Sequence, residues 1–465
     1  MPNNQESYLR LDDVRVDDVS IVLGPDNKIS IMDHYALIEI SENIFQNNIS
    51  GVIAQIDAVN LPTNIPITGQ EMLELTFHTP SVGEPITLQF LIDKITDAAP
   101  LQNKQTQMYD IHFVCPTYLS NLFININTCF DGSISQAVEN IFKSHWNPGN
   151  NVSSTKDMAR RQLLTVEPSY GRSKIIIPNW TPLFAINWLS KRAISNDFNK
   201  SANYVFYQDL DGFHFSSVDA LFMKAPARMY IFGVTDAEEV VRGGMDKEID
   251  VDSTLSNIKK LKICGWNRSE ETKKGAYASS LLMHNIISKR YENFAYSPIQ
   301  DTDERPTLNA HPSYLSRGVY NVANKGKSYF VPTHTWLHET GEESDSVVPK
   351  TGNDNVQIWL QRHDAQKAQL LSNSIEFDVS GDSTRRVGDV VSVLIQSMEG
   401  VDETGQMKVD GYLSGNYLVT EIRHRIAKGN QGHKMRMKLC KDSDIEPYSP
   451  LVDAGTSVDS EIGFA

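Results

Sequence analysis

The sequence is short of the features that mark several common protein classes. Its 465 residues include four cysteines, at positions 115, 129, 264 and 440, and none has the C-x-x-C spacing of redox or metal motifs. No run approaches the roughly 18 apolar residues of a membrane-spanning helix. The first residues, MPNNQESYLRLDD, lack the basic and apolar regions of a signal peptide. We therefore expect free thiols in a reducing cytoplasm and no membrane insertion.

Basic charge is also scarce relative to acidic charge. The chain carries 43 Lys and Arg against 58 Asp and Glu, which gives a formal net charge of −15. A general nucleic-acid binder would present a basic face, so this balance argues against that class. The motifs G-x-S-x-G, P-loop and G-x-G-x-x-G are absent as well, which removes the commonest signs of hydrolase, nucleotide or dinucleotide chemistry.

The strongest metal-like pattern is His334-Thr-Trp-Leu-His338, because two histidines four apart can share a helix face. The H-E-x-x-H order is missing, and Pro332 and Gly341 crowd the segment, so we treat both histidines as weak candidates and expect surface or interface roles. His112, His214 and His424 lie inside strand patterns and are expected to be polar partners. We predict no catalytic residue, no metal and no cofactor.

Near both ends of the chain, apolar and polar residues alternate as they do in β-strands. We assign residues 1–18 to a polar N-terminal arm and 19–116 to a first β module, in which Leu73, Leu75 and Phe77 alternate with polar residues. Residues 223–250 carry a strand expected to join a second β module at 374–442, where Ile375, Phe377 and Val379 alternate. Residues 443–465 form an acidic tail. The two modules repeat an architecture, without visible sequence repetition.

The middle of the chain is mixed. Over 117–222, Ser133 opens an S-x-x-Q capping box with an amphipathic helix behind it, and Pro182 suits the first position of a second helix. Asp211-Gly212 between two apolar runs indicates a β-hairpin. Over 251–373 we expect helices and long loops, with one helix starting near Gly275, one between 355 and 371, and loops over 309–346.

Four stretches resemble the baseplate hub proteins of contractile-tailed bacteriophages. They are LPTNIPITGQE at 61–71, with Gly69 and Glu71; FDGSISQAVENIF at 130–142 followed by IPNWTPLF at 177–184 and DGFHF at 211–215; GAYAS at 275–279 with YENFAY at 291–296; and GDVV at 388–391 with GNYLV at 415–419 and His424. The structural positions of the family motif are Gly69, Glu71, Pro182, Asp211, Gly212, Gly388, Asp389 and Tyr417.

The resemblance implies an α+β, multidomain fold with two tail-tube-like antiparallel β-barrel domains that bracket a mixed α/β middle. It implies a homotrimer in a phage virion, a pseudo-sixfold ring that adapts the sixfold tail tube to the threefold central spike. Its partners would be the spike protein and tube or tube-initiator proteins, with wedge and tape-measure proteins as further candidates. DNA would pass through the lumen without specific binding, and we expect acidic side chains there to keep phosphate from sticking.

Two alternatives stay open. One is the spike-hub of a type VI secretion or tailocin-like injection machine, although such proteins often continue into a repetitive β-prism that this sequence lacks before Ala465. The other is a tail-associated peptidoglycan hydrolase or peptidase, for which His338 and Glu339 are the residues to replace.

Overall fold

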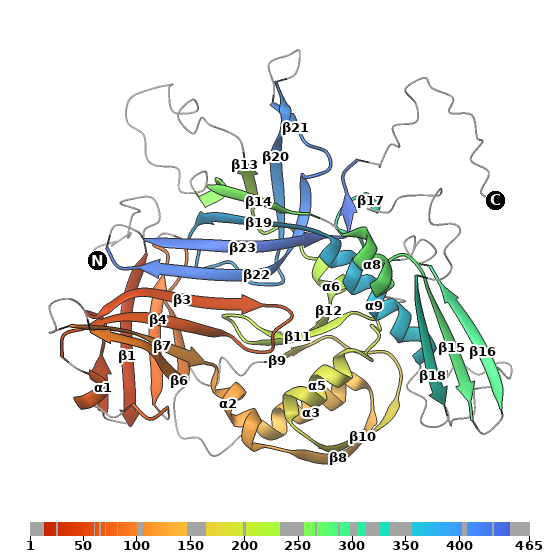
Figure 1. The fold of residues 1–465 in the computed structure, drawn as a ribbon, viewed down its shortest axis with the longest axis horizontal. Coiled ribbons are helices and arrows are strands. Elements are labelled where there is room, and N and C mark those ends of the chain that lie inside the picture. The colour runs from red at the N-terminus through yellow and green to blue at the C-terminus, as the bar shows by residue number, and fades with distance from the viewer. Residues whose placement is uncertain are drawn as a thin grey trace, which may run out of the picture.

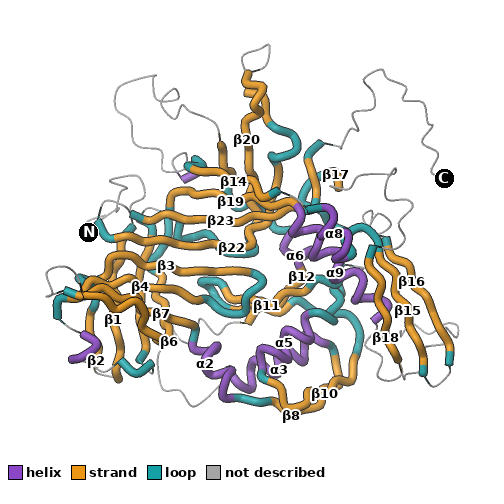
Figure 2. Tube along the Cα trace, in the orientation of Figure 1, coloured by secondary structure: helices purple, strands orange, loops and turns teal. Residues whose placement is uncertain are grey.

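The computed structural model of the chain describes residues 14–24, 27–59, 61–64, 67–69, 71–80, 82–100, 106–146, 164–198, 201–232, 255–265, 267–286, 289–297, 305–312, 326–333, 356–401, 407–429 and 432–446. These residues are mostly antiparallel β-sheet, with few helices (Figures 1 and 2).

The strands are β1 (Arg15–Gly24), β2 (Asn27–Ser30), β3 (Tyr35–Asn43), β4 (Ser50–Asp57), β5 (Met72–His78), β6 (Ile86–Pro100), β7 (Gln107–Val114), β8 (Ile126–Gly132), β9 (Leu164–Val166), β10 (Ser173–Trp180), β11 (Tyr204–Gln208), β12 (Phe213–Ser217), β13 (Met229–Phe232), β14 (Lys260–Cys264), β15 (Ser279–Asn285), β16 (Arg290–Tyr296), β17 (His311–Pro312), β18 (Lys327–Thr333), β19 (Asn373–Ser380), β20 (Val390–Val401), β21 (Met407–Val409), β22 (Gly415–Ala427), β23 (His433–Lys441) and β24 (Ser443–Asp444). The helices are α1 (Leu61–Asn64), α2 (Pro116–Phe123), α3 (Ile134–His145), α5 (Pro182–Ser190), α6 (Val218–Phe222), α8 (Arg268–Lys274) and α9 (Val356–Ser372).

Strands β1 to β7 form a ring that we call the N-terminal repeat. The pairings run β3–β4–β7–β6–β5–β1–β2, and the turn 31–34 connects β2, at one end of this order, to β3, which lies six strands away in it. The ring encloses one apolar core, to which alternate residues such as Ile21, Leu75, Phe77 and Ile111 contribute. The alternation predicted for β5 is confirmed. Residues 15–18, expected in an arm, belong to β1 instead, because Val16 packs on this core.

Strands β13, β14, β19, β20, β22 and β23 form a second ring, the C-terminal repeat. The pairings run β14–β19–β23–β22–β20–β13. The ring closes where Ile231 of β13 bridges Asn257, just before β14, with a hydrogen bond of 3.0 Å from Ile258 N to Ile231 O. It has its own core, which includes Tyr230, Phe377, Val391 and Met437.

One strand pair joins the two repeats. The first half of β22 pairs with β20 inside the C-terminal repeat, and its second half pairs with β3 of the N-terminal repeat. As a result a single fourteen-stranded sheet runs through both repeats. Figure 1 shows β14, β19, β23, β22, β3 and β4 in this order, side by side.

The middle unit, residues 116–222, packs below this sheet in the view of Figure 1. The predicted capping box is present: Ser133 Oγ accepts from Gln136 N, and Gln136 Oε1 accepts from Ser133 N. Pro182 stands at the first turn of α5, and β11 and β12 form the predicted hairpin. Apolar faces of α3, α5, β10, β11 and β12 share a third core.

A lateral sheet of β16, β15 and β18 stands at the right of Figure 1, next to α8 and α9. Here one prediction is wrong: Gly275 does not start a helix but ends α8, with φ of +91°. Residues 279–285 form β15, because Ser279, Leu281 and Met283 share a buried face at period two. The loops expected over 309–346 contain β17 and β18, whereas α9 lies where a helix was predicted.

Candidate functional site

The seam between the repeats, formed by β3 and β22, is the feature that places them side by side. Seven residue pairs run from Glu421 opposite Asn43 to Ala427 opposite Leu37. Ile40 and Ile422 point into the cores and are fully buried. On the other face Arg425 Nε lies 2.7 Å from Glu39 Oε1. The seam therefore has an apolar inner side and a charged outer side.

A polar trio is buried at the seam. His424 Nε2 lies 3.1 Å from Glu42 Oε1, and His424 Nδ1 lies 3.1 Å from His433 Nε2. All three side chains are shielded from solvent, and Phe77 packs its ring near both histidines. His424 was expected to be a polar partner within a strand, and this is confirmed, although its burial is complete.

Burial sets the protonation of this trio. It lowers the pKa of His424 to about 3, and the nearby Arg386 adds to this effect. Burial raises the pKa of Glu42 well above its usual value, against the opposing pull of Arg386. A neutral imidazole next to a carboxyl that resists ionisation is the arrangement that an apolar seam tolerates best.

A second joint ties the middle unit to the C-terminal repeat. Arg386 donates through Nε and Nη2 to the two carboxylate oxygens of Asp211, each at 2.9 Å. The same guanidinium donates to the carbonyls of Ser383 and Arg385. Asp211 lies in the hairpin turn, where Asp209 Oδ1 accepts from Asp211 N and Gly212 N. The Asp-Gly pair thus forms the turn and presents a carboxylate to the neighbouring repeat.

The β11–β12 hairpin reaches both repeats. Tyr207 packs in the core of the C-terminal repeat, and Leu210 packs in the core of the N-terminal repeat. Gln208 Oε1 accepts from Ile49 N at 3.2 Å, next to the β3–β4 turn. Asn47 in that turn exchanges hydrogen bonds with Asn187 of α5. The middle unit therefore braces the repeats relative to each other.

The motif positions Gly69, Glu71, Gly388 and Asp389 belong to the same turn in the two repeats. Glu71 O accepts from Ile92 N at the start of β5, as Asp389 O accepts from Val419 N at the start of β20. Gly69 and Gly388 have φ of +87° and +82°, which favours glycine. This correspondence was not visible in the sequence.

The two acids differ in environment. Burial raises the pKa of Glu71, but hydrogen bonds from Thr68 and Gly69 outweigh it and hold the pKa below its usual value. For Asp389 burial prevails and the pKa is raised. Both carboxylates accept backbone N–H groups of their turns, so their geometry is that of structural caps.

The remaining predicted positions are spread out. Tyr417 is buried in the second core, and its hydroxyl donates to Leu413 O at 2.6 Å. Pro182 lies at α5, within the third core. His334 and His338 lie outside the described residues, so the weak metal pattern stays untested.

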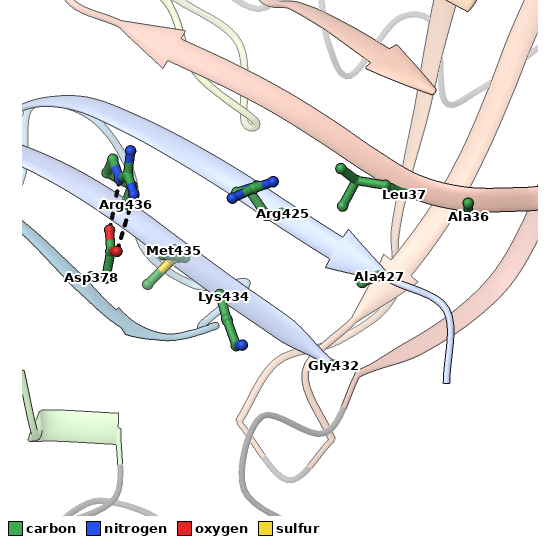
Figure 3. Close-up of a pocket in the computed structure, with 9 residues that line it drawn as sticks. All are labelled: Ala36, Leu37, Asp378, Arg425, Ala427, Gly432, Lys434, Met435 and Arg436. Atoms are coloured by element: carbon green, nitrogen blue, oxygen red, sulfur yellow. Dashed lines mark hydrogen bonds and ion pairs between the residues drawn. The ribbon is translucent and has the colours of Figure 1, made fainter. Parts of the chain in front are cut away.

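Two hollows lie on the outward face of the continuous sheet. One, of about 190 Å³, is lined by Leu37, Asp378, Arg425, Lys434 and Arg436 among others, and Figure 3 shows these side chains. The other, of about 280 Å³, lies beside it over β22, β3, β4, β7 and β6. Residues of both β3 and β22 line each of the two hollows.

Ion pairs cover the outward face. Arg436 donates to both oxygens of Asp378, at 2.7 and 3.1 Å (Figure 3). On β14, β19, β23, β22 and β3 basic side chains outnumber acidic ones among the residues that the ladder places on this face, which are Lys260, Lys262, Glu376, Asp378, Lys434, Arg436, Lys438, Glu421, Arg423, Arg425 and Glu39. This part of the face is thus mixed and leans basic, whereas Asp93 and Lys94 both line the second hollow.

Within the described part of the chain, no cluster of three or more His, Cys, Asp or Glu could hold a metal. No helix there combines the length and apolarity needed to cross a bilayer. The four cysteines are free, as predicted. The groups that converge are structural ones, and two that matter most, Glu42 and Arg386, carried no signal in the sequence that could have identified them.

The fold is similar to that of phage tail proteins. The tail protein from Neisseria meningitidis MC58 aligns over 92% of this chain and 97% of its own, with a TM-score of 0.50 and 11% identity. The 43 kDa tail protein of prophage MuSo2 from Shewanella oneidensis aligns over 91% and 98%, with a TM-score of 0.51 and 10% identity. An E. coli component of the type VI secretion system aligns over 94% and 79%, with a TM-score of 0.39 and 9% identity. No protein-family model and no curated sequence matches the chain.

Proposed function

We propose that this protein is the structural hub of a contractile-tail baseplate, and not an enzyme. The observation that carries the proposal is the pair of rings, of seven and six strands, that are joined side by side by the β3–β22 seam. Each ring is interpreted as a tail-tube-like barrel. Three chains, each with two barrels side by side, close a ring of six barrels, which matches a sixfold tube on one side and a threefold spike on the other.

The hollowed outward face of the sheet is the surface proposed to line the central channel. It runs without interruption across both repeats, and each repeat contributes strands to it. The middle unit contacts both repeats through the Arg386–Asp211 ion pair and through Tyr207 and Leu210 of the hairpin, which supports a rigid ring.

The charge of the proposed channel lining differs from the one expected from the sequence. We expected acidic side chains, but on β14, β19, β23, β22 and β3 this face carries charges of both signs, partly in ion pairs, with more basic than acidic residues. Side chains already paired with a carboxylate offer phosphate less attraction than free ones, so paired charge is compatible with the passage of DNA.

The proposed partners are a central spike protein on one side of the ring and tube or tube-initiator proteins on the other, with wedge and tape-measure proteins as further candidates. The proposed location is the virion tail. The likeness of fold to two phage tail proteins over nearly their whole length supports this placement.

The test is the mass and shape of the purified chain. Light scattering is expected to give three times the chain mass of 52.2 kDa, and negative-stain images are expected to show a threefold ring with a central hole. A stable monomer at all concentrations, or particles without a bore, would contradict the proposal.

A further inference from the structure

Five strands of one repeat correspond in register to five strands of the other, and this correspondence predicts an interface. In the N-terminal repeat one row of paired residues crosses β3, β4, β7, β6 and β5, and an equivalent row crosses β14, β19, β23, β22 and β20. The first row is Ser41, Ser50, Val114, Leu91 and Met72, and the second is Cys264, Ser374, Cys440, Leu418 and Val390.

An irregularity in both ladders supports the match. The β6–β7 register shifts between Ile92 and Lys94, and the β22–β23 register shifts between Val419 and Glu421. Both shifts fall one to three residues beyond the common row. Strand β6 is therefore the counterpart of β22, and β14 is the counterpart of β3.

Strands β3 and β22 have partners that their counterparts lack. Strand β22 uses its first half for β20 and its second half for β3, whereas β6 uses residues 86–91 for β5, and no described strand pairs with that side beyond them. Strand β14 pairs with β19 on one side. On its other side β13 reaches only Asn257 and Ile258, and no described strand pairs with residues 260–264 there. An open edge on each repeat is a template for another strand.

The solvent exposure of two isoleucines indicates that these edges lack a partner strand. Ile263 of β14 occupies the position of Ile40 in β3, and it is 52% exposed whereas Ile40 is fully buried against the seam. Ile95 of β6, the counterpart of the buried Ile422, is half-buried. The β6 edge thus has a half-buried isoleucine and the β14 edge an exposed one. This is expected if both edges form a second seam-like pairing that is absent from the single chain.

We propose that β14 pairs antiparallel with β6 of a neighbouring copy of this chain, in the register of the β3–β22 seam. Arg423 faces Ser41 in the seam, so Thr96 faces Cys264 of the neighbour. The pairing rests on the proposed ring, and it specifies which edges close it. Each repeat then uses one edge inside its own chain and the other between chains.

The test is a cross-strand disulfide. Directly opposed residues in an antiparallel pair lie about 4.5–5.5 Å apart between Cα atoms, which suits a disulfide. Thr96→Cys is oxidised with oxidised glutathione and run on a non-reducing gel, where dimer and trimer bands that vanish on reduction are expected. Thr96→Cys with Cys264→Ser is the matched control, in which those bands are expected to disappear while the exposed Cys129 stays.

A second variant tests the interface without a disulfide. Ile263→Asp places a charge on the proposed inner side of the interface and is expected to release monomers with an unchanged circular dichroism spectrum. Ile176→Asp, at a site on β10 that is 71% exposed, is the matched control and is expected to keep the trimer.

The outcomes separate the two proposals. If Ile263→Asp leaves the trimer intact and Thr96→Cys gives no cross-link, this pairing is overturned but the hub assignment is not. A wild-type chain that forms no trimer overturns both. Cross-linking that persists without Cys264 also overturns the register.

Discussion

Glu42 and His424 face each other across the β3–β22 seam, with 3.1 Å between Oε1 and Nε2, and neither side chain reaches solvent. They are 382 positions apart in the chain. With His433 they are the polar centre of a joint whose inner side otherwise consists of isoleucines such as Ile40 and Ile422, and their protonation makes the joint sensitive to acid.

His424 is predicted to make the fold acid-labile. Its pKa is about 3 when folded and returns to its ordinary value of 6.5 on unfolding, so the unfolded chain binds more protons between these values. The stability it contributes is complete above pH 6.5 and is lost as the pH falls. At pH 5 the loss is about 2 kcal/mol by linkage. His424→Gln should flatten the dependence of the melting temperature on pH between 7 and 5.

Glu42 is predicted to act in the opposite direction. Burial raises its pKa, so the folded state holds a proton that the unfolded state gives up, and this contribution is lost as the pH rises through the folded pKa. Removing it with Glu42→Gln should make the acid-side fall in melting temperature steeper than in the wild type. Equal slopes in both variants would rule out a role for this pair.

Arg386 and Asp211 are predicted to contribute unequally to stability. Asp211 is exposed, so Asp211→Asn should lower the free energy of unfolding by less than about 1 kcal/mol. Arg386→Gln should cost about 1–3 kcal/mol, because the partly buried carbonyls of Ser383 and Arg385 also lose their charged donor. Urea denaturation measures both, and Glu139→Gln, in an exposed pair on α3, serves as a null control.

Gly388 is predicted to tolerate no side chain. Its φ is +82°, and a Cβ there would lie 2.5 Å from the Tyr207 hydroxyl oxygen. Gly388→Ala should therefore cost about 2–4 kcal/mol, from backbone strain and overpacking together. Gly429→Ala is the matched control, with φ of +84° and open space around it, and should cost about 1 kcal/mol. Equal losses would show that the Tyr207 contact carries no weight.

The ion pair across the seam is predicted to be weak but specific. Arg425→Glu sets two carboxylates opposite each other and should lower the melting temperature, whereas Arg425→Glu combined with Glu39→Arg should restore it. The coupling energy should stay below about 1 kcal/mol, because both side chains are partly exposed. Failure of the double variant to recover would contradict the observed register.

Local pattern was sufficient for much of the fold. The alternation in β5, the capping box at Ser133 and the Asp-Gly hairpin each depend on residues within one element, so sequence alone predicted them. For residues 279–285 the prediction was wrong, because Ala278, Leu281, Leu282 and Ile286 could share one face of a helix whereas the segment is a strand. The strand forms because β16 and β18 pair with it, and those strands lie further along the chain.

The joints could not be predicted in the same way. Glu39 and Lys262 occupy equivalent places in the two repeats, but they carry opposite charges, so comparison of the sequences would not align them. Gln361, Gln366 and Gln369 of α9 are polar, and nothing in the sequence around them predicts that they are buried. They are buried because they donate to or accept from backbone and serine groups of two neighbouring units.

The counterpart strands also differ in what lies between them. Only a short turn, 44–49, separates β3 from β4, whereas residues 265–372, with the lateral sheet and α9, stand between β14 and β19. In an annulus of three such chains every second sector would bear this outgrowth. The inner wall would then repeat six times per revolution while the outer rim repeats three times, and a single polypeptide would carry both periodicities.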